Sequence, residues 1–409
     1  MQQMDVKGTY LNGTLKEEIY MAQPEGYDDG SNKACRLKKT LYGLKQSGRE
    51  WNTELDFQLG KRGYRRIHSD PCVYIQKTPD RTMIITVWVD DMLIFATTIL
   101  AMKIAKRDIS DAFEVTDLGE PSKIVGIEIT RDREQRKITI TQTSYIETIL
   151  AKYGLQDACP VRTPLDPNIK LEPGEMETGN RSNNYVSLIG SLMYAAVATR
   201  PDIAFAVNRL ASFTANPTMC HWTAAKHVLR YLKGTKNIGI TYSKPETEDM
   251  VNQSGLIGYS DASFANNYDR TSVSGYVFKA AGGAITWGSK KQNIVSLSTT
   301  EAEYICLSDA AREATWLRNL YEEVGFPQEE PTLVYGDNLS ALAIAENPRY
   351  HRRTKHFDIK HHYIRDQVSN KTIVTGYLPT AQMTADIFTK ALPRQAHELH
   401  RNSLGLFSA

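Results

Sequence analysis

Two adjacent acids stand in the middle of an apolar run. The segment ITVWVDDMLIF, residues 85–95, carries Asp90 and Asp91 between flanks that have the composition of a buried strand. Neighbouring carboxylates repel each other, and burial makes ionising both of them costly. A hairpin turn is the ordinary interpretation because aspartate favours turns. The segment contains no Gly or Pro to form a tight turn, so a cation bound between the carboxylates is the alternative.

A third acid, Asp5, lies between apolar neighbours in MDVKGTYLNG. Three carboxylates can hold two Mg²⁺ ions about 4 Å apart, the arrangement that serves in-line phosphoryl transfer. Mg²⁺ prefers a few carboxylates plus substrate phosphates to a cage made of protein alone. The first part of the chain therefore holds a candidate nucleotidyl-transfer site that uses Mg²⁺ or Mn²⁺.

Four further acids stand at the ends of expected strands and at the starts of expected helices in the second half. Each one alone is ordinary, since strand ends and helix N-termini favour acids. Together they can converge on one edge of a single α/β unit, which predicts a second two-metal site, built for hydrolysis. They are Asp261, Glu301, Asp337 and Asp386, with Glu303 as the competing choice for the glutamate.

The expected elements define the domains that must position these acids. A helix is expected at 46–62, two strands meeting at Asp90–Asp91, a hairpin at 123–142 and a helix at 144–155, capped by Ser144. Three helical stretches are expected in 185–233, and strands alternate with helices from about 255, which predicts a mixed sheet. The predicted domains are 1–155, a proline-rich linker at 156–184, a helical connection at 185–250, and 251–409.

Composition narrows the class of protein. The chain has 409 residues and a formal charge of +2, so nucleic-acid binding must come from local basic patches. No apolar run approaches the roughly 20 residues that span a bilayer. The five cysteines contain no CxxC pair, so a zinc site or disulfide framework is not indicated and an intracellular setting is expected. The start, MQQMDVKGTY, reads as the middle of a domain, which suggests a truncated fragment.

Two basic segments have open interpretations. The stretch RYHRRTKHFDIKHH, 349–362, holds four of the nine histidines, but their spacing does not fit a helical zinc site. A solvated face or contact with nucleic-acid phosphates remains, through Arg352, Arg353, Lys355 and Lys360. Segment 185–234 carries basic residues beside apolar stripes. It could follow a duplex or act as a structural spacer.

The order of several motifs resembles the reverse transcriptase and ribonuclease H portion of copia-type retrotransposon Pol polyproteins. The motifs run along nearly the whole chain. They are QMDVKGTYLNG, QPEGY, LKKTLYGLKQSGREW, WVDDMLI, GIEITR, SLIGSLMYAAVATRPDIAFAVNRLASF, YSDASFA, STTEAEY, GDNLSA, KHFDIKHHYIRD and ADIFTKALP.

The resemblance implies a role for each candidate residue. Asp5, Asp90 and Asp91 would be polymerase metal ligands, Tyr10 would screen the sugar 2′ position of the incoming nucleotide, and Gln46 would touch that nucleotide. Asp261, Glu301, Asp337 and Asp386 would be ribonuclease H metal ligands, with water as the nucleophile. The family register favours Glu301 over Glu303.

The sequence departs from the family pattern at several points. Trp88 replaces the usual tyrosine before the two aspartates, and Gly48 stands where proline is usual. The fingers region that normally precedes QMDV is absent from the sequence, and the loop GYLPTAQMTA lacks the histidine that many ribonucleases H carry. The resemblance therefore implies an N-terminally truncated chain whose polymerase activity is in doubt.

The expected fold is a multidomain mixture of α+β and α/β parts: an incomplete reverse-transcriptase palm, a helical connection and a ribonuclease H-like mixed-sheet domain. The expected function is RNA-directed DNA synthesis with cleavage of RNA in RNA–DNA hybrids. The alternatives are ribonuclease H activity only, or a non-catalytic nucleic-acid-binding relic. Expected partners are the hybrid, primer-template, deoxynucleoside triphosphates and other Pol or Gag products, with no membrane. A cytoplasmic virus-like particle and the nucleus are the expected locations.

Overall fold

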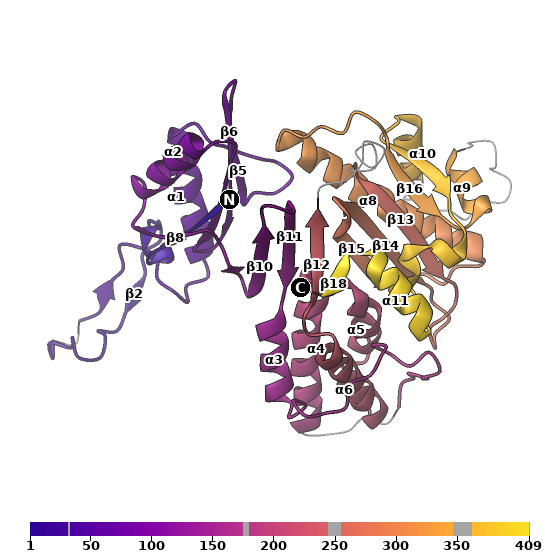
Figure 1. Cartoon of the computed structure of the whole chain (residues 1–409). Helices are drawn as coiled ribbons and strands as arrows, with labels where there is room; N and C mark the ends of the chain where they lie inside the picture. The colour runs from indigo at the N-terminus through magenta and orange to yellow at the C-terminus, as the bar shows by residue number, and fades with distance from the viewer. Residues whose placement is uncertain (32, 175–179, 244–254, 347–361, 409) are drawn as a thin grey trace. The chain divides into compact units, whose positions relative to one another are not determined.

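The chain packs as two compact units, each described here by itself. The computed structural model describes residues 1–31, 33–174, 180–243, 255–346 and 362–408. The first unit is Met1–Val125 with Asn319–Phe326, and the second is Gly126–Arg318 with Pro327–Ala409 (Figure 1). Both units combine helices with β-sheet, which confirms the predicted mixed fold class. No helix in these ranges is long and apolar enough to span a membrane.

The first unit is built on a six-stranded sheet with the order β4-β5-β6-β7-β1-β8. Alternation along β6 buries Met83, Ile85 and Val87 on one face, as period-two patterning requires. The helix expected at 46–62 is α1, and its Trp51 and Leu55 are both buried in the core of this unit. The two strands predicted to meet at the paired aspartates are β6 and β7.

The elements of the first unit follow in chain order. They are β1 (Gln2–Val6), η1 (Thr9–Asn12), β2 (Tyr20–Met21), β3 (Cys35–Arg36), α1 (Ser47–Lys61), β4 (Arg65–Arg66), β5 (Val73–Thr78), β6 (Arg81–Trp88), β7 (Asp91–Ala96), α2 (Ile99–Ser110), β8 (Val115–Gly119) and β9 (Lys123–Ile124).

The second unit contains a five-stranded mixed sheet with the order β15-β14-β13-β16-β17. Strands β13, β14 and β15 pair antiparallel, whereas β13–β16 and β16–β17 pair parallel. Helix α8 packs on this sheet through an apolar face that includes Tyr304 and Leu307. The mixed sheet confirms the expectation for the C-terminal part of the chain.

A second sheet of this unit runs β18-β12-β11-β10, and helices α3, α4, α5 and α6 gather beside it (Figure 1). Both sheets and these helices share one continuous hydrophobic core. Leu165 and Leu171, from the segment read as a linker, are buried in that core. The hairpin β10–β11 and helix α3 also belong to the second unit, which begins at Gly126. The predicted domain bounds stay predictions.

The elements of the second unit follow in chain order. They are β10 (Ile127–Asp132), β11 (Lys137–Thr141), α3 (Thr143–Lys152), α4 (Asn180–Ala198), η2 (Pro201–Ile203), α5 (Ala204–Ala211), α6 (Met219–Gly234), β12 (Ile238–Ser243), β13 (Ile257–Ser263), β14 (Val273–Ala280), β15 (Gly283–Lys291), α8 (Thr299–Glu323), β16 (Thr332–Gly336), α9 (Leu339–Glu346), α10 (His362–Ser369), β17 (Ile373–Tyr377), η4 (Thr380–Gln382), η5 (Thr384–Phe388), α11 (Arg394–Ser403) and β18 (Leu406–Ser408).

Two local expectations differ from the structure. Helix α3 begins at Thr143, and the predicted cap Ser144 instead donates its backbone N–H to Glu128 Oε1 at 3.0 Å. Asp386 does not open the last helix: it lies in the 3-10 turn η5, and α11 begins only at Arg394. Of the basic stretch, Arg352, Arg353, Lys355 and Lys360 lie outside the described residues.

A fully buried ion pair ties the helices of the second unit together. The guanidinium of Arg200 donates to both oxygens of Asp202, at 2.9 and 2.7 Å. Tyr231 on α6 also donates to Asp202 Oδ2, at 2.6 Å. His397 Nε2 of α11 lies 3.2 Å from the Asp202 carbonyl oxygen. Burial by itself would raise the pKa of Asp202, but the charge and hydrogen bonds of Arg200, together with His397 and Tyr231, lower the pKa below its ordinary value, so the pair stays charged.

We expect Asp202→Asn to destabilise the second unit by about 3–5 kcal/mol, because the buried Arg200 charge loses its partner. Urea unfolding followed by circular dichroism measures the change. Glu398→Gln is the control, because its pair with Arg394, at 2.9 Å, is largely exposed and is worth about 0–1 kcal/mol. Equal losses in the two variants would contradict this account of the pair.

Candidate functional site

Two aspartates reach the same level of the mixed sheet because of strand register. In the parallel pair β13–β16, Tyr259 is the partner of Tyr335. Asp261 and Asp337 each follow two residues later, and residues two apart in a strand share a face. Both carboxylates therefore emerge side by side at the carboxyl ends of neighbouring strands, which is where the sequence predicted that acids would converge.

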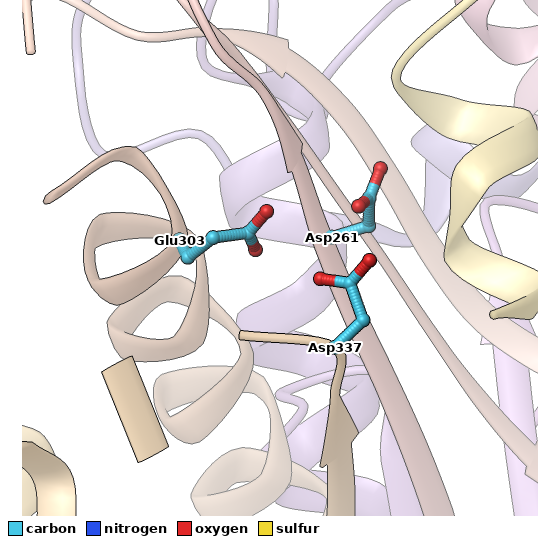
Figure 2. Close-up of side chains that lie close together, drawn as sticks. All are labelled: Asp261, Glu303 and Asp337. Atoms are coloured by element: carbon cyan, nitrogen blue, oxygen red, sulfur yellow. The ribbon is translucent and has the colours of Figure 1, made fainter. Parts of the chain in front are cut away.

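Helix α8 supplies the third carboxylate, and it comes from Glu303. One ligand oxygen each of Asp261, Glu303 and Asp337 lies within 4.8 Å of the others, and the three side chains point toward a common space (Figure 2). Glu301, the residue favoured from the family register, is not in this group. It accepts the backbone N–H of Leu297 at 2.6 Å, so the geometry favours Glu303, the competing choice, and the role of Glu301 as a metal ligand stays a prediction.

The fourth acid, Asp386, approaches from the turn η5, which packs on β13 and β14. A glycine permits this approach: Gly275 on β14 is the strand partner of Asp261. A Cβ at position 275 would lie 2.6 Å from Thr389 Cγ2 and 2.7 Å from Phe388 Cβ. The turn can therefore lie flat against the sheet only because residue 275 has no side chain.

Neutral donors and one lysine surround the carboxylates. The Thr389 hydroxyl donates to Asp261 Oδ2, and the Thr380 hydroxyl donates to Asp337 Oδ2 at 2.6 Å. Lys390 Nζ lies 2.9 Å from Asp386 Oδ1, one helical turn along the chain. These contacts orient three of the acids without any bound ion.

Burial and mutual repulsion dominate the electrostatics of the site. Burial raises the pKa of Asp261, the charge of Asp386 raises it further, and Lys390 opposes both. Burial also raises the pKa of Glu303, with the charges of Asp261 and Asp337 adding to it. Burial alone would lower the pKa of Lys390, but Asp261 and Asp386 attract its ammonium strongly enough to raise the pKa above the ordinary value.

Such a cluster fits a divalent cation. Its donors are all carboxylate oxygens, the ligands that Mg²⁺ and Mn²⁺ prefer. Ligand oxygens on one Mg²⁺ lie about 3–4 Å apart, given Mg–O distances of about 2.1 Å and octahedral geometry. The spacing of up to 4.8 Å between Asp261, Glu303 and Asp337 therefore closes onto an ion with small side-chain movements.

The first unit also brings its three acids to one place, but more loosely. Asp5 on β1 and Asp91 at the start of β7 are partners in the antiparallel ladder. Asp90 precedes Asp91 in the turn, and its carbonyl accepts the Val6 N–H at 2.9 Å. Burial, followed by the charges of Asp90 and Asp91, raises the pKa of Asp5. Among the described residues, however, these three do not meet the spacing of the second site.

A strained turn presents the aspartate pair. Trp88 and Asp91 are ladder partners, so Val89 and Asp90 form a two-residue hairpin turn. Val89 has a φ of +55°, a conformation that is costly for a β-branched residue. The indole N–H of Trp51 donates to the Val89 carbonyl at 2.9 Å. Asp90 therefore lies in a hairpin turn, as the ordinary interpretation of the sequence predicted, although the turn contains no Gly or Pro.

The nucleotide-binding candidates lie in the same unit. Tyr10 sits in η1, and its ring packs edge-on against Tyr42 with centroids 4.8 Å apart. Gln46 is the residue before α1. No side-chain cap contact holds Gln46 there, and both residues are half-buried. Their predicted contacts with an incoming nucleotide stay predictions.

Sequence reasoning missed three residues that shape the two sites. Two of them, Lys390 and Thr389, stand in the motif ADIFTKALP. Lys390 is four residues after Asp386, and this spacing was the available signal for an ion pair. The third is Trp51, and nothing in the sequence indicated that its indole N–H would reach the turn at Val89.

Comparisons with known proteins agree along the whole chain. A family model described as reverse transcriptase (RNA-dependent DNA polymerase) matches residues 1–167. The retrovirus-related Pol polyprotein from transposon TNT 1-94 of Nicotiana tabacum is 41% identical over 418 residues, covering 100% of this chain and 31% of that polyprotein. A transposon Ty5-1 protein of Saccharomyces cerevisiae is 31% identical over 314 residues, covering 76% of this chain and 100% of that protein.

Among solved structures, LC11 ribonuclease H1 in complex with an RNA/DNA hybrid covers 33% of this chain and 94% of its own, with 16% identity and a TM-score of 0.26. The chain spans about a third of the length of the tobacco polyprotein, 31%.

We expect Glu303→Gln to raise the stability of the metal-free protein at pH 7 by about 1–2 kcal/mol. The raised pKa of Glu303 means that its ionisation opposes folding, and glutamine removes that charge. The gain should shrink as the pH falls toward 4.5, the ordinary pKa of this carboxyl. Thermal unfolding in EDTA measures it, with Glu301→Gln as the control two residues away. A gain in Glu301→Gln instead would restore Glu301 as the site residue.

We expect Trp51→Phe to destabilise the first unit by about 1–2 kcal/mol, because the Val89 carbonyl loses its indole donor while the aromatic packing is kept. Chemical denaturation measures the loss. Trp88→Phe is the control, since Trp88 is 63% exposed and should change stability by less than about 0.5 kcal/mol. An effect of Trp51→Phe no larger than this control would show that the turn does not depend on the indole.

Proposed function

This chain belongs to the Pol polyproteins of copia-type retrotransposons, and from that premise we propose that its second unit hydrolyses the RNA strand of RNA–DNA hybrids. The convergence of Asp261, Glu303 and Asp337, with Asp386 beside them, carries this proposal. The family assignment supports the reverse transcriptase and ribonuclease H class as a whole. Because the chain spans only part of its relatives, activity is proposed here for the two units and not for a whole polyprotein.

The residues of the second unit prepare the site for hydrolysis. Asp261, Glu303 and Asp337 would hold a divalent cation, and Asp386 would complete the set for a second one. When bound, such cations lower the pKa of a coordinated water and neutralise charge on the attacked phosphate. Thr389 and Thr380 fix the orientation of Asp261 and Asp337 through their hydroxyl groups. The closing turn η5 keeps this edge of the sheet partly shielded from water.

Recognition of the hybrid would rest on its phosphates and its shape. Duplexes that contain RNA are recognised mainly through shape, 2′-hydroxyls and phosphates. Contacts with phosphates weaken as salt rises. We keep Arg352, Arg353, Lys355 and Lys360 as proposed phosphate contacts on sequence grounds alone. The proposal therefore includes a salt-dependent affinity without base preference.

The first unit supports a second proposed activity, DNA synthesis on an RNA or DNA template. Its supporting observation is the ladder pairing of Asp5 with Asp91, beside Asp90. These three acids would act with Mg²⁺ or Mn²⁺ and the triphosphate of a deoxynucleotide, whose oxygens would complete the looser site. Tyr10 and Gln46 would contact that nucleotide.

A crossed experiment separates the two activities. We expect the purified chain with Mg²⁺ to cleave the RNA of a labelled RNA–DNA hybrid. Asp337→Asn should reduce cleavage by on the order of 100-fold or more, as loss of a preorganised charged group at a reacting centre does. Asp5→Asn should leave cleavage unchanged. In a primer-extension assay, Asp5→Asn should abolish DNA synthesis, and Asp337→Asn should leave it unchanged.

Two results would contradict the proposal. Absence of cleavage with both Mg²⁺ and Mn²⁺, although the hybrid binds, would leave a non-catalytic nucleic-acid-binding protein. Cleavage that persists in Asp337→Asn would come from another site or another nuclease. Cleavage without any primer extension would support the hydrolase-only alternative.

A further inference from the structure

Lys390 stands at the acidic cluster in a position that no part of the proposed chemistry requires. Its Nζ atom lies 2.9 Å from Asp386 Oδ1. The side chain of Asp386 is only 8% exposed, whereas that of Lys390 is 35% exposed. The lysine therefore reaches from the solvent side to a carboxylate that is otherwise buried.

The ammonium acts on more than its direct partner. Its charge also attracts Asp261 and Asp337. Within the described residues, the other side chains that donate to Asp261 and Asp337 are neutral: the hydroxyls of Thr389 and Thr380. His400 also faces Asp386, but burial lowers the pKa of its imidazole, so the ring is uncharged at neutral pH.

The positions of the four acids divide the cluster in two. Asp261, Glu303 and Asp337 meet the spacing of a cation site, and Asp386 is not in that group. Asp386 is instead occupied by Lys390. One cation position is thus open in the metal-free protein, while the position beside Asp386 already holds a positive charge.

We propose that Lys390 is a built-in counter-charge that holds Asp386 in place without metal and must be displaced before a divalent cation can bind that carboxylate. This inference rests on the proposed function, since it presumes that the cluster binds metal. It adds an order of binding: the Asp261–Glu303–Asp337 position fills first, and the Asp386 position binds more weakly because the ammonium competes for it.

A cavity beside Lys390 can accept its side chain once the lysine leaves Asp386. Lys390 lines a cavity of about 310 Å³ together with Ser263, Asn266 and Asp166. Lysine has a flexible four-carbon stem and a compact charge. Its ammonium can therefore turn from Asp386 toward this cavity, whose lining also includes the carboxylate of Asp166.

Mn²⁺ binding to the full chain, measured by isothermal titration calorimetry and by paramagnetic resonance of free Mn²⁺, tests the proposal. Lys390→Met should tighten the weaker Mn²⁺ site about tenfold, since a competing unit charge within a few ångströms is removed. The same variant should unfold at a lower temperature in EDTA, because Asp386 is left buried without a partner. Mn²⁺ should restore that loss.

Matched variants separate charge from packing. Lys390→Arg keeps the positive charge and should bind Mn²⁺ as the unchanged chain does, and Lys390→Gln should behave as Lys390→Met if the latter folds poorly. Lys279→Met is the control: this lysine is also mostly buried, but it lies over the ring of Tyr259, 5.7 Å from the centroid. It should leave both Mn²⁺ affinities unchanged.

The Mn²⁺ titrations distinguish failure of the proposed metal site from failure of the proposed role of Lys390. If the unchanged chain shows no Mn²⁺ binding that Asp337→Asn removes, the proposed metal site itself fails. If that binding is present but Lys390→Met leaves the weaker site unchanged or weakens it further, the proposed function stands and the role of Lys390 is overturned.

Discussion

The second unit is organised around repulsion between carboxylates that the backbone does not allow to separate. Parallel pairing of β13 with β16 sets Asp261 and Asp337 at one level, and helix α8 brings Glu303 against them. Asp261 lies on β13, Glu303 lies on α8 and Asp337 directly follows β16, so the hydrogen bonds and packing of these elements hold the carboxylates close together. The cluster therefore persists at a cost to stability, as preorganised sites do. Burial first, and repulsion after it, raise the pKa values of Asp261 and Glu303.

Stability that offsets this repulsion comes from the helices beside the site. The core that contains α4, α5 and α6 also contains Val273 of β14 and Phe388 of η5, two elements that border the acids. The buried pair of Arg200 with Asp202 adds an anchor that reaches α11 through His397. Because these contacts are continuous, the helical segment is part of the framework of the site and not merely a spacer.

The basic residues of that segment illustrate the same point. Arg200 is fully buried, His227 Nε2 lies 3.0 Å from the Thr163 carbonyl, and Arg230 donates to the Cys159 carbonyl at 2.8 Å. The last two contacts hold segment 156–174 against α6. The idea that these side chains follow a duplex is therefore not favoured, since their polar groups serve internal contacts. The prolines of this segment suggested a linker. However, Leu165 and Leu171 of the same segment are buried in the core of the second unit.

Much of the framework was predictable because it depends on local patterns. The apolar flanks of Asp90 and Asp91 predicted the two strands that are β6 and β7, and the helix predicted at 46–62 is α1. The choice between Glu301 and Glu303 was not predictable in this way. Residues two apart lie about 200° around a helix, so Glu301 and Glu303 point in different directions although both are buried. Which of them meets Asp261 and Asp337 depends on the tertiary packing of α8 on the sheet. Likewise, no local rule predicts a valine with φ of +55° in a turn that a distant indole must hold.

The two sites differ in how far the chain alone completes them, and burial is the reason. Asp5, Asp90 and Asp91 are half-buried, and water screens their repulsion, so a turn held by Trp51 is sufficient to present them. Such a site needs the phosphates of a substrate to close around a cation. Asp261 and Asp386 are almost fully buried, where repulsion is screened far less. There the chain supplies its own donors, from Thr389, Thr380 and Lys390, and these contacts hold the geometry of the acidic cluster without a bound ligand.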